Sequence, residues 1–378
     1  GMDDYHLGCE HGLPIYCPVD DNGQFAHTDD LPETEQMPIE LLGKSILEKN
    51  GKSEANEAVI ELLQTNNSLV HQENYTHSYP HCWRSKTPVI FRGMDQWFIK
   101  IDHNDFRQKA LKAIQEVNWV PSWGQNRIEG AVEARPDWCI SRQRTWGVPI
   151  PAFYSAEGDP ILDARIVRNT ADLIGEHGSN VWFERDTADL WADIKPEDWE
   201  GADPAGKSQD TLDVWIDSGS SSRSVIMQRE ELHHPEKEGT ENWQADIYLE
   251  GSDQHRGWFQ SSLLLSLAGN DAPPFKTVLT HGFMVDADRE KIAKSREGSY
   301  AKPQTCEAYI NEYGADIVRL WVASQDFRND IIVSNERIKK VAETYRNLRN
   351  ALRYQLSNLY DFDPANDAVP NDKLTGLD

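Results

Sequence analysis

Length, composition and charge already exclude several classes of protein. The sequence has 378 residues, and its 38 Lys and Arg stand against 63 Asp and Glu, for a formal net charge of −25. That balance excludes a basic nucleic-acid coat protein, and an aromatic content of 10% excludes a disordered acidic chain. We expect a folded protein of two or three sub-structures.

The composition also predicts a compartment. No apolar run approaches the roughly 18 residues of a membrane span, and residues 1–30 contain no charged-then-apolar leader. Five cysteines are scattered and never form Cys-x-x-Cys, which argues against a disulfide framework and a thiolate zinc site. We expect a cytoplasmic protein without a membrane partner and without zinc.

The first half of the chain predicts a mixture of short elements. Leu13–Val19 has the pattern of a strand broken by prolines. Residues 29–67 are helical in pattern: a first helix has its apolar face between residues 39 and 47 and a stop at Gly51, and a second short helix covers Ala55–Gln64. Residues 79–101 have strand character. Helices are expected from an Asn104 cap to Val117 and over Gln125–Ala134.

A short apolar strand, Trp138–Ser141, runs into the donor-rich loop Arg142–Gly147. Residues 154–209 are acidic and broken by Gly and Pro, so we expect a small insertion with a helix near residues 169–176. Strands and helices then alternate, which predicts an α/β fold with a parallel sheet. The expected strands are 211–216, 245–249 and 277–280, and the expected helices are 253–268, 305–312 and 315–324.

One long helix is predicted over Ser334–Leu359 from an apolar stripe at helical spacing. Residues 331–353 carry a local charge of +4, which is opposite in sign to the net charge of the whole chain. This helix is a candidate surface for RNA.

Two motifs have ordinary explanations that we favour. Residues Gly201–Ser208 satisfy the phosphate-loop pattern, but no apolar strand precedes them and a strand is predicted after them, so the match is formal. A group of His71, His77, His81 and Cys82 could suggest zinc, yet Ser85 stands where a second thiolate would complete Cys-x-x-Cys. We interpret it as a solvated loop.

Two other motifs indicate a nucleotide site. Tyr248–Phe259 passes from a strand end through a glycine turn into a predicted helix, with Glu250 and Asp253 placed to bind ribose and ammonium groups. Asp253 could instead be a simple N-cap. In Lys291–Ser295, two lysines three residues apart can place ammonium groups on a triphosphate.

Four stretches, in this order along the chain, resemble the class I aminoacyl-tRNA synthetases, most closely those specific for isoleucine. The resemblance covers nearly the whole chain, and the stretches are Pro136–Pro149, Asp210–Gly219, Leu249–Phe259 and Val278–Phe283 leading into Lys291–Ser295. It implies a Rossmann-like catalytic domain interrupted by an editing insertion and followed by an all-α anticodon-binding domain. Residues 1–75 would be a remnant of the editing insertion with a connector, 76–330 the second half of the catalytic domain including the acidic insertion, and 331–378 the start of the helical domain.

The resemblance also implies a reaction. Isoleucine and ATP, with Mg²⁺, give isoleucyl-adenylate, which then esterifies the terminal ribose of isoleucine tRNA, in an enzyme expected to be monomeric. Glu250, Gly251, Asp253 and Gln254 would bind the adenylate. Trp215 and Trp258 would wall an isoleucine slot, and such slots discriminate against one missing methylene by only about 10- to 200-fold.

The same resemblance assigns the lysine loop and the editing acid. Lys291–Ser295 corresponds to the Lys-Met-Ser-Lys-Ser signature, so Lys294 would bind the ATP phosphates, helped by Lys291 and Ser295, while Ile292 and Ala293 depart from the pattern. Asp4 corresponds to the acid of the editing pocket that holds a misacylated amino group.

The family's His-Ile-Gly-His signature does not occur in this sequence. We therefore interpret the chain as the middle of a longer enzyme, and we expect it not to form adenylate by itself. Two alternatives are a non-catalytic tRNA-binding module that uses the basic helix, and a phosphate-loop NTPase that uses residues 201–208.

Overall fold

The computed structural model describes residues 2–13, 16–26, 28, 31–48, 52–82, 85–286, 289, 292 and 305–375. The chain divides into two compact units, Gly1–Gln96 and Trp97–Asp378. Among the described helices, none combines the length and the apolar character that crossing a bilayer requires.

The first unit has little regular structure. It contains α1 (Met2–Glu10), α2 (Glu54–Thr65) and isolated bridges such as Val19 to Phe25. The expectation for α2 is confirmed, and its N-cap Ser53 accepts a hydrogen bond from the amide of Asn56 at 3.4 Å. The first helix expected before Gly51, in the pattern that begins at residue 29, is wrong: the described backbone over residues 31–48 forms turns and bends.

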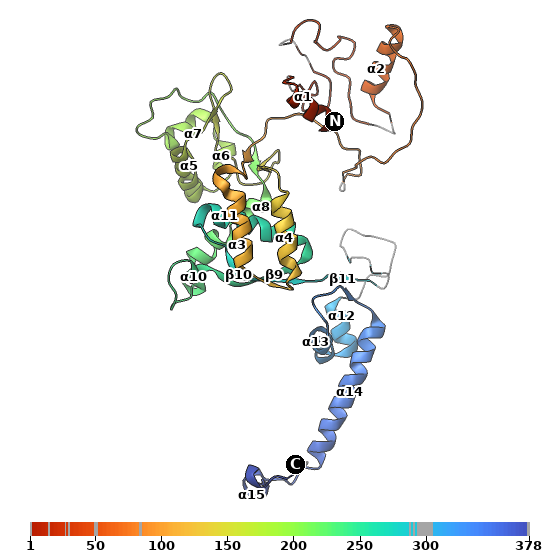
Figure 1. Ribbon diagram of the computed structural model, residues 1–378, viewed down its shortest axis with the longest axis vertical. Coiled ribbons are helices and arrows are strands. Elements are labelled where there is room, and N and C mark those ends of the chain that lie inside the picture. The colour runs from red at the N-terminus through yellow and green to blue at the C-terminus, as the bar shows by residue number, and fades with distance from the viewer. Residues whose placement is uncertain are drawn as a thin grey trace. The chain divides into compact units, whose positions relative to one another are not determined.

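The second unit is built on a three-stranded parallel sheet, which confirms the predicted α/β class. Its order is β2 (Asn118–Val120), β10 (Phe275–His281), β9 (Ala245–Gly251), so β9 is an edge strand within the described residues. Figure 1 shows α3 (Phe106–Glu116), α4 (Trp123–Glu133) and α11 (Trp258–Asn270) beside this sheet.

One face of the sheet is packed against these helices, and among the described residues the other face is exposed along β9. Trp119, Val278 and Tyr248 are register neighbours on three strands, and all three are buried in the core with Phe259 and Leu263. On the opposite face, Ile247 and Leu249 are each 54% exposed.

Local geometry corrects three predicted boundaries. Asn104 takes a φ of 50° and does not cap α3, which begins at Phe106 after the 3₁₀ turn η1 (His103–Asp105). The helix predicted from Asp253 is split into η4 (Ser252–Arg256) and α11, because Gly257 is non-helical (φ −137°, ψ −120°). The strand predicted over 211–216 ends at Leu212.

The second unit also contains short antiparallel strand pairs outside the main sheet. β1 (Phe98–Ile99) pairs with β3 (Trp138–Cys139), and β4 (Ser141–Arg142) pairs with β8 (Thr211–Leu212), in both cases antiparallel. α8 (Val214–Gly219) follows β8, and Asp213 caps it. The segment before β9 holds α9 (Ser221–Ser224), η2 (Ile226–Gln228), η3 (Glu230–Leu232) and α10 (Thr240–Trp243).

The acidic insertion has a core of its own. Its sheet joins β5 (Phe153–Tyr154), β6 (Pro160–Ile161) and β7 (Gly206–Lys207). Its helices are α5 (Ala164–His177), α6 (Val181–Glu184) and α7 (Thr187–Ile194). Phe153, Trp182 and Leu190 are completely buried between them.

Helices dominate the C-terminal segment. β11 (Met284–Val285) pairs in parallel with β12 (Ile331–Ile332), and α12 (Cys306–Tyr313), α13 (Ala315–Ala323) and α14 (Asn335–Ser357) surround a core that includes Tyr309, Trp321 and Ile338. α14 confirms the predicted long helix, with Ser334 as its N-cap. α15 (Pro364–Asp367) and η5 (Asn371–Lys373) follow.

Candidate functional site

The candidate site lies where β9 and β10 end. Glu250 is paired in register with Thr280, and Gly251 with His281, so both strands deliver their last residues to one edge of the sheet. Ligands bind at the carboxyl ends of parallel strands in open α/β sheets because the loops there are free to diverge. Glu250 and Asp253 are both exposed at this edge.

Gly251 has a specific steric role at the turn after β9. A Cβ at this position would lie 2.8 Å from the ring of Phe283 and 3.2 Å from Oδ1 of Asp253. Any side chain would therefore push the ring away from the turn. The glycine lets the segment after β10 pack directly against the turn that carries Asp253 and Gln254.

Gln254 takes the capping role that the sequence suggested for Asp253. Its Oε1 accepts a hydrogen bond from the amide of Trp258 at 2.9 Å, at the first residue of α11. The N-cap interpretation of Asp253 is thus wrong, and the carboxylate of Asp253 lies instead on η4.

The two predicted indole walls lie close to this turn. The ring of Trp258 stacks on Tyr248 with centroids 4.1 Å apart, and its Nε1 donates to the carbonyl of Ser218 at 2.8 Å. Trp215 is 39% exposed, and a Cβ at Gly257 would lie 2.9 Å from its ring. The structure therefore brings Trp215, Gln254 and Trp258 together from α8, η4 and α11.

A buried histidine that the sequence analysis did not predict packs against the turn after β9. His255 is completely buried; its Nδ1 lies 3.0 Å from the carbonyl of Ser252 and its Nε2 lies 3.5 Å from Oγ1 of Thr280. Burial lowers its pKa below the ordinary value. A Cβ at Gly124 would come within 3.1 Å of Nε2, so the glycine in α4 makes room for the ring.

An apolar groove of about 640 Å³ adjoins the ends of β9 and β10. Leu249 and Leu279 line its sheet side, and Phe283, Met284 and Ile292 line it farther along the chain. Ile292 donates its amide hydrogen to the carbonyl of Met284 at 3.3 Å. Lys291, Ala293, Lys294 and Ser295 lie outside the described residues.

Asp213 is another residue without a role in the sequence prediction. It is 4% exposed, its Oδ1 caps α8 by accepting from the amide of Trp215 at 3.4 Å, and its Oδ2 accepts from Nε1 of Trp138 at 2.9 Å. Nη2 of Arg142 lies 3.0 Å from the same oxygen. An Asp directly before a helical turn is an N-cap signal that could have revealed this role.

The remaining sequence candidates fall elsewhere. Asp4 lies in α1, and its side chain is outside the described part. The phosphate-loop interpretation is contradicted, because Gly206 and Lys207 form β7 and the Lys207 ammonium donates to the carbonyls of Trp182 and Arg185. In the loop of His77 and His81, as in every described region, no three His, Cys, Asp or Glu side chains are grouped closely enough to hold a metal.

Comparison with known proteins agrees with the resemblance noted in the sequence. Residues 28–334 match the family model of the class I tRNA synthetases (I, L, M and V). Isoleucine–tRNA ligases of Methylacidiphilum infernorum, Geobacter sulfurreducens and Thermotoga maritima are 48%, 46% and 45% identical to this chain, and each match covers 100% of the chain. The chain spans 38% of the length of each.

Among solved structures, a leucyl-tRNA synthetase of Agrobacterium radiobacter K84 matches with 17% sequence identity and a TM-score of 0.43. The match covers 64% of this chain and 30% of the synthetase chain, and it is too loose to bear on the site. The family model, in contrast, covers most of the chain and includes the whole β9–β10 edge. This chain therefore belongs to the class I tRNA synthetases, in the group that handles isoleucine, leucine, methionine and valine.

Proposed function

We propose that this chain forms part of the catalytic domain of an isoleucine–tRNA ligase. The observation that carries the proposal is the edge of the sheet. Exposed carboxylates stand at the end of β9 and on η4, Gln254 of the same turn bonds the amide of Trp258, and an apolar groove adjoins the strand ends. Names of the relatives support isoleucine as the amino acid and its tRNA as the acceptor. We expect the whole enzyme to act in the cytoplasm as a monomer.

The proposed first step joins isoleucine to ATP. The carboxylate of isoleucine attacks the α-phosphorus of ATP, the bond to the β-phosphate oxygen breaks, and pyrophosphate leaves with Mg²⁺ as its counter-ion. Glu250 accepts hydrogen bonds from the isoleucine ammonium, and Asp253 accepts them from the ribose hydroxyls. Lys294, with Lys291 and Ser295, would stabilise the charge that develops on the leaving phosphates.

The second step transfers the aminoacyl group. A ribose hydroxyl at the 3′ end of the tRNA attacks the carbonyl carbon of the adenylate, and AMP leaves. Trp215 and Trp258 would hold the aliphatic side chain, and a slot of this kind separates isoleucine from valine by only about 10- to 200-fold. Asp4 would hold the amino group of a misacylated product in the editing pocket of the longer enzyme.

Calorimetry with a non-hydrolysable isoleucyl-adenylate analogue tests the proposal. We expect the purified chain to bind it, and Glu250→Ala to weaken binding by about tenfold or more, since a hydrogen bond to a charged group is worth roughly 1.5–3 kcal/mol. Glu157→Ala, at an exposed carboxylate in the turn between β5 and β6, is the matched control. Unchanged affinity in Glu250→Ala would show that the site is misassigned.

A second measurement addresses activity. The chain lacks the His-Ile-Gly-His tetrapeptide, so we expect no pyrophosphate exchange from it with isoleucine and ATP. Measurable exchange would contradict this expectation while leaving the binding experiment valid.

A non-catalytic RNA-binding role rests on one observation about α14. Six basic residues face two acidic ones over residues 331–353, and Leu348 and Leu352 are more than half exposed. This alternative predicts salt-sensitive tRNA binding without affinity for the adenylate analogue. The calorimetry above separates the two functions.

A further inference from the structure

Two buried polar side chains, those of His255 and Thr280, lie next to the candidate site and have no role in the adenylate chemistry above. His255 is on η4 and completely buried, and Thr280 is 1% exposed near the end of β10. Nε2 of His255 lies 3.5 Å from Oγ1 of Thr280. This contact joins the turn after β9 to the central strand of the three-stranded sheet.

The hydrogen bonds of His255 determine where its ring proton lies. Nδ1 is 3.0 Å from the carbonyl oxygen of Ser252, which can only accept, so Nδ1 carries the hydrogen. Burial lowers the pKa of the ring below its ordinary value, which keeps the ring neutral near neutral pH. Nε2 therefore accepts a hydrogen bond from the hydroxyl of Thr280.

Neighbouring groups pack against the imidazole of His255 on several sides. Its centroid lies 6.1 Å from that of Trp119, 5.7 Å from that of Trp123 and 5.4 Å from that of Phe259. A Cβ at Gly124 would lie 3.1 Å from Nε2. An imidazole packed this closely cannot take another rotamer without moving its neighbours, so it fixes the distance between η4 and β10.

The contact between His255 and Thr280 connects the two carboxylates of the site. Thr280 is the register partner of Glu250, and Asp253 lies two residues before His255 within η4. In the described structure β9 pairs with β10 alone, so the position of Glu250 depends on β10. The position of Asp253 depends on η4. The spacing between the two carboxylates is therefore set where η4 meets β10.

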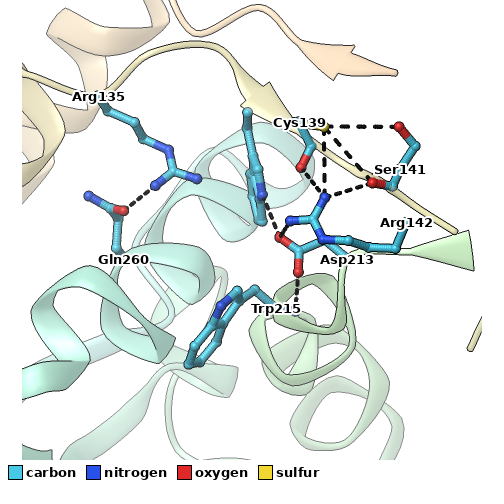
Figure 2. A network of polar contacts seen from close by, with 8 residues as sticks. Arg135, Cys139, Ser141, Arg142, Asp213, Trp215 and Gln260 are labelled. Atoms are coloured by element: carbon cyan, nitrogen blue, oxygen red, sulfur yellow. Dashed lines mark hydrogen bonds and ion pairs between the residues drawn. The ribbon is translucent and has the colours of Figure 1, made fainter. Parts of the chain in front are cut away.

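The indole side of the site has a different anchor. Asp213 caps α8, which carries Trp215, and its Oδ2 accepts a hydrogen bond from Nε1 of Trp138 at 2.9 Å. Figure 2 shows this carboxylate between Arg142 and the start of α8. These contacts lie on β3, β4 and α8. A change at η4 should therefore move the carboxylates and leave Trp215 in place.

We propose that His255 is a positioning residue for the adenylate, and that with Thr280 it sets the spacing of Glu250 and Asp253. Because it is completely buried, it acts through the backbone of the turn rather than by contact with the ligand. The inference rests on the proposed function, which assigns these carboxylates to the isoleucine ammonium and the ribose. Binding groups work only when held within about 0.5 Å of the productive geometry, so a small shift of η4 weakens binding.

Calorimetry with the isoleucyl-adenylate analogue tests the inference through the partners of His255, because replacing the histidine itself also changes the stability of the fold. We expect Thr280→Val, which keeps the shape of the side chain and removes its hydroxyl, to weaken binding about fivefold, the size of one neutral hydrogen bond. Thr280→Ser keeps the hydroxyl and should retain most of the affinity. The matched control is Thr170→Val, at an equally buried hydroxyl that donates to the carbonyl of Ile166 at 2.7 Å, and it should bind as the wild type does.

A second pair of variants moves the ring without removing a hydrogen-bonding group. Gly124→Ala places a methyl group 3.1 Å from Nε2 of His255, so the imidazole has to shift. We expect binding to weaken at least as much as in Thr280→Val. Gly130→Ala, on the same helix, adds its methyl group where no described atom lies within 4 Å, and it should leave binding unchanged.

The preference for isoleucine distinguishes positioning from a general loosening of the site. The valyl-adenylate analogue is shorter by one methylene, and the slot for the side chain senses this difference. Because Trp215 is anchored through Asp213, Thr280→Val should weaken binding of both analogues by the same factor and leave their ratio unchanged. A site that is loosened as a whole would lose the preference as well.

Amide hydrogen exchange gives a readout that does not require the ligand. The amides of Gly257 and Trp258 both bond to Gln254, one to its carbonyl and the other to its side chain. If the contact of His255 holds this turn, Thr280→Val should make these two amides exchange faster. Exchange in α5 should not change.

Three results would overturn the inference. The first is wild-type affinity for the analogue in both Thr280→Val and Gly124→Ala. The second is equal weakening by the controls Thr170→Val and Gly130→Ala, and the third is a Thr280→Ser variant that binds as weakly as Thr280→Val.

The proposed function is judged separately. Weaker binding in Glu250→Ala together with unchanged binding in Thr280→Val would retain the function and reject the positioning role. A wild-type chain that does not bind the analogue would reject the function, and exchange in Thr280→Val would then decide about His255. Faster exchange of Gly257 and Trp258 would retain its role in holding the turn, and unchanged exchange would reject it.

Discussion

The acidic insertion buries its apolar side chains among themselves, whereas the sheet that carries the candidate site buries only one of its faces in the part of the chain that the structure describes. Phe153, Trp182 and Leu190 are completely enclosed by elements of the insertion. On the sheet, Ile247 and Leu249 remain 54% exposed although the opposite face is tightly packed. A region can therefore have a fully enclosed apolar core without carrying the candidate site. In this chain the candidate site lies on the sheet, the region with more exposed apolar side chains.

The largest expected effect tests whether the two cores are independent. Phe153 and Phe259 are both completely buried, one in each region. Replacing either by alanine should cost about 3–5 kcal/mol of unfolding free energy, measured in urea. Phe259 contacts His255 with ring centroids 5.4 Å apart, so we expect only Phe259→Ala to weaken binding of the adenylate analogue. Equal weakening by Phe153→Ala would show that the two regions are coupled.

His255 gives the next largest effect, with a defined pH dependence. His255→Gln should cost about 1–3 kcal/mol, because it disturbs buried hydrogen bonds. Burial lowers the pKa of this histidine from its ordinary value of 6.5, so the unfolded chain takes up a proton more readily than the folded one. Its contribution to stability is therefore complete above about pH 6.5 and is lost as the pH falls below that value.

Urea unfolding at about pH 7.5 and about pH 5.5 measures this dependence. The wild-type chain should lose stability between the two conditions, and His255→Gln should lose less. The same loss in both proteins would mean that another group titrates.

The open face of the sheet should tolerate change. Ile247→Thr should alter the unfolding free energy by less than about 0.5 kcal/mol, since the side chain is mostly in water. Val278→Thr, on the packed face, places a hydroxyl in the core and should cost roughly 1–3 kcal/mol. If Ile247→Thr is as destabilising as Val278→Thr, the face is covered in solution.

The smallest effect concerns the insertion at low pH. Hydrogen bonds from Arg165 lower the pKa of Asp163, the N-cap of α5, to about 2. A carboxylate with a lowered pKa stabilises the fold above its ordinary pKa, and that stabilisation is lost as the pH falls from about 4 to about 2. Asp163→Asn keeps the capping oxygen without the charge and should flatten this part of an acid titration followed by tryptophan fluorescence. An unchanged acid transition would contradict the assignment.

Much of the fold could be predicted because its signals are local. α4, α5 and α14 follow from apolar spacing over a few turns, and the parallel sheet follows from the alternation of strands and helices. Glu250 and Asp253 could be placed at a ligand-binding edge because strand ends in such sheets have that property.

The missed features depend on residues that are distant in sequence. Asp213 ends β8 early because it caps α8 and binds Trp138, 75 residues away. Gln260 meets Arg135 across 125 residues, so no local pattern reveals their contact. Gly257 breaks the predicted helix where the ring of Trp215 leaves no room for a side chain.

The edge position of β9 should be visible in the exchange of its amide hydrogens with solvent. In the described structure β9 pairs with β10 alone, and in a parallel pair only alternate residues direct their N–H and C=O groups to a given neighbour. Protection along Ala245–Gly251 should therefore alternate from residue to residue, while β10, paired on both sides, should be protected more evenly. Glu250 therefore lies on a strand that is hydrogen-bonded on one side only, so its position depends on the stability of the hydrogen bonds between β9 and β10.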